Sequence, residues 1–135
     1  MSTNNLWGEI PVESEIKLPV TILKEQASIL GEKTNKILEA TVTQINTQSK
    51  DTVAYSFNII APALSNYKFK VLTLTHPAIF VYPVNITFQQ NAGNWVQRSC
   101  TDESQFIEML GQILSSEIVH KAVGALIAQS KAAAA

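Results

Sequence analysis

Within residues 52–60, positions 53 to 59 alternate between large apolar and small or polar side chains. A strand turns successive side chains to opposite faces, so this alternation predicts a β-strand with one buried face. Such a strand cannot stand alone, because something apolar must cover its buried side. The positions expected to face the core are Val53, Tyr55, Phe57 and Ile59.

Four further segments have the composition of strands, at residues 38–47, 67–75, 79–89 and 95–100. They are rich in β-branched and aromatic residues. Short polar or glycine-containing turns separate most of them, and consecutive strands joined in this way form an antiparallel meander. The sequence therefore predicts a sheet of four or five antiparallel strands.

Amphipathic helical patterns flank this block of strands on both sides. Residues 21–34 precede it, and residues 102–130 follow it with an interruption near Ser115. Thr101 or Asp102 is the expected N-cap of the first C-terminal helix. Strands grouped between helices predict an α+β fold. We expect an N-terminal extended arm and helix, a meander sheet, and two C-terminal helices packed on one sheet face.

The N-terminal segment carries a second pattern with a period of two. Between residues 9 and 20, even positions are mostly apolar and odd positions are charged or proline. Pro11 and Pro19 have no N–H donor, which excludes a central strand. We expect residues 1–20 to form an arm along a sheet edge or groove, followed by a helix capped by Thr21. The predicted partner-binding residues are Trp7, Ile10, Val12, Ile16 and Leu18.

The length of the chain supports one core. With 135 residues, it is large enough for a single domain and too small for two. We expect one α+β domain over residues 21–130. The alanine-rich residues 131–135 are interpreted as a frayed helix end or a vector-derived extension.

Charge excludes several classes of partner. Lys and Arg total 10, Asp and Glu total 11, and Arg98 is the single arginine. Phosphate contacts need a basic surface, so we expect no nucleic-acid partner. No apolar run approaches the ~18 residues of a membrane span, so we expect no membrane partner.

Two features favour a cytoplasmic location. The N-terminus has neither the basic nor the apolar region of a signal peptide. The single cysteine, Cys100, cannot form an internal disulfide, which fits a reducing compartment.

Few residues have the chemistry of a catalytic site. Cys100, His76 and Asp102 are the residue types of a thiol nucleophile, its base and an orienting carboxylate, but no local motif ties them together. The simpler interpretation makes Cys100 a small core residue and His76 a turn residue. We therefore predict no catalytic residues, and the sequence favours a non-enzyme over an enzyme.

Metal and cofactor sites are not expected either. Two histidines and one cysteine are too few for a zinc site. The five glycines are scattered and form no phosphate-binding loop. We predict no metal and no cofactor.

The leading hypothesis is a non-enzymatic protein–protein interaction domain: an adaptor, an inhibitor or a small chaperone-like protein, with a homodimer as one form. A net charge of −1 leaves little repulsion between copies. The alternative is a small-ligand-binding protein or enzyme with an apolar pocket between sheet and helices, because aromatic residues concentrate on the predicted strands.

Overall fold

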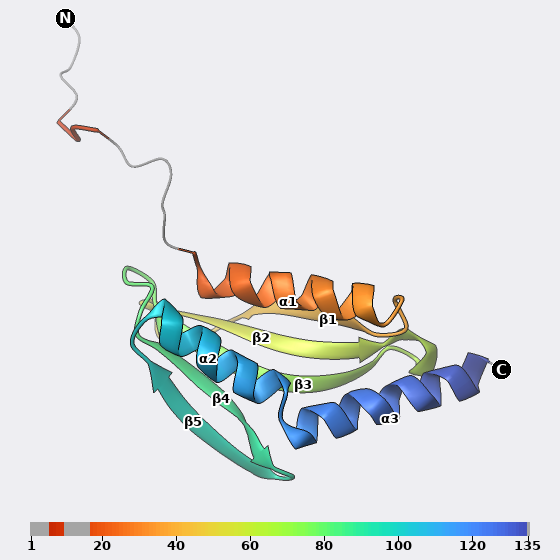
Figure 1. Cartoon of the computed structure of the whole chain (residues 1–135). Coiled ribbons are helices and arrows are strands. Elements are labelled where there is room, and N and C mark those ends of the chain that lie inside the picture. The colour runs from red at the N-terminus through yellow and green to blue at the C-terminus, as the bar shows by residue number, and fades with distance from the viewer. Residues whose placement is uncertain (1–5, 10–16, 135) are drawn as a thin grey trace, which may run out of the picture.

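The protein is described here by a computed structural model that covers residues 6–9 and 17–134. Within these residues the chain forms three helices and one five-stranded sheet (Figure 1). The helices are α1 (Pro19–Lys33), α2 (Glu103–Leu114) and α3 (Glu117–Ala134). The strands are β1 (Glu39–Ile45), β2 (Thr52–Ala61), β3 (Tyr67–Pro77), β4 (Val84–Asn91) and β5 (Asn94–Cys100), with the 3-10 turn η1 (Pro62–Leu64) after β2.

The strands lie in the order β1-β2-β3-β4-β5, and each neighbouring pair is antiparallel. The predicted α+β fold with an antiparallel meander is confirmed. All three helices lie on the same side of the sheet in Figure 1. The side chains of that sheet face therefore meet the apolar sides of the helices.

The covered sheet face and the helices form one apolar core. Phe57 of β2 lies opposite Leu72 of β3, and both are fully or almost fully buried. Leu23 of α1 and Phe106 of α2 pack into the same cluster. The sequence placed Phe57 on the buried side of its strand, and this prediction is confirmed.

The opposite sheet face is polar and uncharged over much of its area. One cross-strand row contains a hydroxyl or amide side chain from every strand: Thr43, Ser56, Thr73, Thr87 and Gln97. At the centre of this face, on β2, Ser56 and Asn58 are buried, and the Ser56 hydroxyl donates to the Asn58 side-chain oxygen at 3.3 Å. Small and polar side chains thus line this face in place of a second apolar core.

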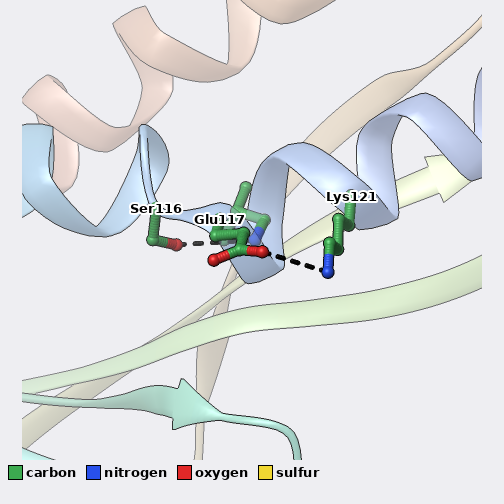
Figure 2. A network of polar contacts seen from close by, with 4 residues as sticks. Ser116, Glu117 and Lys121 are labelled. Carbon is green, nitrogen blue, oxygen red and sulfur yellow. Dashed lines mark hydrogen bonds and ion pairs between the residues drawn. The ribbon is translucent and has the colours of Figure 1, made fainter.

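The two C-terminal helices begin at side-chain caps. Asp102 accepts a hydrogen bond from the Gln105 N–H at 2.8 Å, which confirms the predicted cap of α2. Ser116 Oγ accepts from the Val119 N–H at 3.4 Å at the start of α3 (Figure 2). The i,i+4 pair Glu117–Lys121, at 3.0 Å, follows on the next turn (Figure 2). The predicted interruption near Ser115 is thus a break between two helices.

Helix α1 starts earlier than the sequence pattern indicated. Its N-cap is Leu18 and Pro19 is the first helical residue, so the expected Thr21 cap is wrong. Proline suits this position because the first helical N–H needs no partner within the helix. At the other end of the chain, α3 includes residues 131–134, so these alanine-rich residues are helical.

The fourth strand starts later than predicted. Strand β4 begins at Val84 rather than at residue 79, and residues 78–83 connect it to β3. Pro83 has no N–H to donate to a neighbouring strand, which is consistent with a strand that starts after it. Ile79 and Phe80 therefore belong to an exposed connection and not to the sheet.

Candidate functional site

Strand order separates the residues that could have formed a thiol catalytic set. Cys100 pairs with Val84 of β4, and β4 in turn pairs with β3, the strand that carries His76. Because adjacent strands lie about 4.8 Å apart, two strand spacings, roughly 10 Å, separate the Cα atoms of Cys100 and His76. His76 Nδ1 instead lies 2.8 Å from the Pro77 carbonyl oxygen, and its ring stacks on Tyr55. His76 is therefore not placed to take a proton from Cys100.

Cys100 itself is a buried thiol. Its side chain is 1% exposed. Burial, and then the neighbouring Asp102 carboxylate, raise the pKa of the Cys100 thiol above its usual 9.0. Proximity to the start of α2 could have favoured the thiolate, but burial outweighs that effect. The thiol stays protonated at neutral pH, which is the opposite of what a nucleophile needs.

Tyr82, in the connection between β3 and β4, is a second weakly acidic side chain near Cys100. Its hydroxyl is buried and has no hydrogen-bond partner among the described residues. Burial, and then the charges of Glu103, Cys100 and Asp102, raise the pKa of Tyr82. The Tyr82 hydroxyl and the Cys100 thiol therefore both keep their protons at neutral pH. This favours a packing role for the two side chains over a role in proton transfer.

We expect the thiol of Cys100 to titrate above pH 9 in the native protein. Thiolate absorbance near 240 nm, taken as the difference between the wild type and Cys100→Ala, measures this directly. A midpoint below the usual value would indicate an activated thiolate and would contradict the structural role of Cys100.

The same shift predicts the direction of alkaline instability. A thiol whose pKa is higher in the folded state stabilises the fold fully below its unfolded-state pKa of 9.0. This stabilisation is lost as the pH rises through the higher, folded-state pKa. The free energy of unfolding should therefore fall above about pH 9, and less steeply in Cys100→Ala.

Only part of the predicted partner-binding set falls within the described residues. Trp7 is 83% exposed and Leu18 is 43% exposed. Ile10, Val12 and Ile16 lie outside the described residues. The Leu18 carbonyl accepts the Ile22 N–H at the start of α1.

A hollow of about 750 Å³ lies between α1 and β1. Four of its lining side chains are charged, two lysines and two glutamates. The others are small or apolar. Its lining residues are Lys24, Ala27, Ser28, Gly31, Glu32, Lys36, Glu39, Ala40, Thr41 and Val42.

Two further hollows lie between helices and sheet. One of about 500 Å³ is bounded by α3, η1 and the start of β3. The other, of about 270 Å³, separates α1 from α2 and α3 and has Phe57 and Ile59 at its base. Both hollows lie where the alternative hypothesis expects a ligand pocket, between the sheet and the helices.

The connection between β3 and β4 exposes two adjacent large apolar side chains. Ile79 is 83% exposed and Phe80 is 67% exposed. Figure 1 places this connection at the end of the sheet where α1 and α2 begin. The sequence pattern had assigned Ile79 to a strand, so this exposed pair was missed.

In residues 6–9 and 17–134, no group of three His, Cys, Asp or Glu side chains could hold a metal ion. No helix in the described part of the chain is long and apolar enough to cross a membrane. No protein-family model, curated protein or solved structure matches this chain.

Proposed function

We propose that this protein is a protein–protein interaction domain that takes up an extended segment of its partner along the free edge of β1. One observation carries the proposal. The 750 Å³ hollow is lined by four consecutive strand residues, Glu39, Ala40, Thr41 and Val42. Successive side chains of a strand point to opposite faces, so a hollow lined by consecutive residues runs along the edge of the strand.

The edge of β1 has few of the features that block strand addition. β1 is an outermost strand and pairs only with β2 within the described sheet. It contains no proline and one charged residue, and its register with β2 has no shift. Edge strands are usually protected by prolines, charges or bulges. An added strand would pair with the outward N–H and C=O groups of β1.

The side chains of the hollow define the segment that would fit. Ala27, Ala40 and Val42 supply an apolar surface, Lys24 and Lys36 supply positive charge, and Glu32 and Glu39 supply negative charge. A suitable segment alternates apolar side chains with charged ones. Its apolar side would pack between α1 and β1, and its acidic groups would lie near the lysines and away from the glutamates.

The N-terminal sequence of this chain has that pattern. Ile10, Val12 and Ile16 occupy even positions, and Glu13 and Glu15 lie between them. A second copy of the chain is therefore the partner we propose, with Trp7 and Leu18 at the two ends of the pairing segment. The near-neutral net charge of −1 is compatible with this association.

The test removes the N-terminal segment but keeps the start of α1. We expect the full-length chain to be a dimer by light scattering, with a melting temperature that rises with concentration. Deletion of residues 1–16 should give a monomer that remains folded, because Leu18 and Pro19 at the start of α1 are retained.

A matched pair of variants tests the hollow itself. Ser28→Arg places a long side chain at an exposed position that lines the hollow. Ser104→Arg makes the same change at an exposed position of α2 that does not line it. Only Ser28→Arg should weaken the dimer. A full-length chain that stays monomeric, with stability indifferent to the deletion, would contradict the proposal.

A further inference from the structure

We infer that the hollow between α3 and the start of β3 binds a small, uncharged, aromatic molecule. This site is separate from the edge of β1 and does not depend on the proposed pairing. Its volume of about 500 Å³ lies within the range of about 300–1,000 Å³ that is typical of small-molecule pockets. Its lining residues are Leu64, Tyr67, Phe69, Ala122, Ala125, Leu126 and Gln129.

The walls of this hollow come from three elements that the tertiary fold brings together. Helix α3 contacts η1, and Figure 1 shows α3 running beside the connection between β2 and β3. Tyr67 and Phe69 belong to β3, and Leu64 belongs to η1. The remaining four lining residues belong to α3.

The absence of charge in the lining indicates the charge of the ligand. None of the seven lining residues is Asp, Glu, Lys, Arg or His. An ion placed against this lining would lose part of its hydration without gaining an oppositely charged partner, which is unfavourable. The hollow beside β1, in contrast, has four charged lining residues. The site on α3 therefore favours an uncharged molecule.

The shapes of the lining side chains indicate an aromatic ring. Tyr67 and Phe69 are two residues apart on β3 and so point to the same sheet face. Tyr67 is 54% exposed, which leaves much of its ring available for contact. Ala122 and Ala125 are three residues apart on α3 and present only methyl groups. Aromatic rings attract one another in stacked or edge-to-face contacts, so a planar ring suits the space between β3 and α3.

One polar side chain of the lining indicates that the ligand also carries a hydrogen-bonding group. The Gln129 amide lines the hollow and donates to the Ala125 carbonyl at 3.2 Å. An amide also has an oxygen acceptor, so Gln129 can accept a hydrogen bond from a ligand. A ring with one N–H or O–H group, such as an indole or a phenol, has the required chemistry.

Titration of the full-length, isotope-labelled protein with indole tests this inference. We expect amide shift changes confined to residues 64–69 and 122–130 in two-dimensional NMR spectra. Indole-3-acetate has the same ring and a negative charge, and it should bind at least about tenfold more weakly. Shift changes spread over the whole protein, or equal affinity for the two probes, would overturn the inference.

Two alanine substitutions on α3 provide the matched control. Ala125→Phe fills the hollow from an exposed helix position and should weaken indole binding by at least about tenfold. Ala128→Phe makes the same change at an exposed position outside the lining and should leave the affinity unchanged. The spectra also report whether each variant is folded. Unchanged binding by folded Ala125→Phe would place indole elsewhere and overturn the site.

Discussion

Phe57→Ala should lower the free energy of unfolding by about 3–5 kcal/mol. Phe57 is 2% exposed and lies between Val42 and Leu72 on the neighbouring strands. Truncation removes its contacts with the helices and leaves a cavity at the centre of the sheet. Urea unfolding followed by circular dichroism measures the loss.

Phe80→Ala is the matched control, because it makes the same truncation on a side chain that is 67% exposed. Its effect should stay within about 0.5 kcal/mol. Equal effects of the two substitutions would mean that the covered face of the sheet is not the one that contains Phe57.

Val84→Asp should prevent folding at neutral pH. Val84 is fully buried, and its strand partner Cys100 is also buried. A carboxylate at this position would be desolvated beside the apolar core. The expected cost is at least several kcal/mol, a large fraction of the ~5–15 kcal/mol that stabilises a typical domain. Loss of the cooperative thermal transition is the measurement.

The pH dependence of Val84→Asp distinguishes buried charge from altered shape. Burial raises the pKa of a carboxyl group, so any remaining stability should be greatest at low pH and fall as the group ionises. Asn85→Asp is the control, because residue 85 points to the opposite face of the same strand and is only half-buried. A Val84→Asp variant that melts like the wild type would contradict the burial of this face.

Local patterns were sufficient to predict most of the fold. The alternation in residues 52–60 predicted the strand and the burial of Phe57 and Ile59, because the period of a strand is a property of its own backbone. Val53 and Tyr55 are only half-buried, and Ala54, Ser56 and Asn58 on the other face are buried as well. Asp102 was predictable as a helix cap, since a cap bonds to an N–H only three residues away. The errors occurred at Pro19 and Ile79. The alternation of the N-terminal segment continued into the first turn of α1, and the apolar pattern of the fourth strand began before the strand itself, which starts after Pro83.

The candidate sites were much less predictable, because their residues meet only through tertiary packing. The distance between Cys100 and His76 depends on β4 lying between their strands. The hollow on α3 needs a helix to pass beside β3, which is about 55 residues earlier in the chain. The spacing of side chains within one segment does not predict contacts between distant segments. Bringing such segments together costs chain entropy, and only the completed core offsets that cost.

By itself, the sequence determined the α+β class, the meander of strands, the burial of Phe57 and the near-neutral charge. These follow from side-chain spacing and composition, which act over a few residues or over the whole surface. The tertiary structure alone decided that β1 is an outermost strand beside a hollow and that Ile79 and Phe80 are exposed. It also decided that the Cys100 thiol is buried away from a base. Exposure and proximity depend on which distant segments pack together, and that is a property of the assembled core rather than of any segment of the chain.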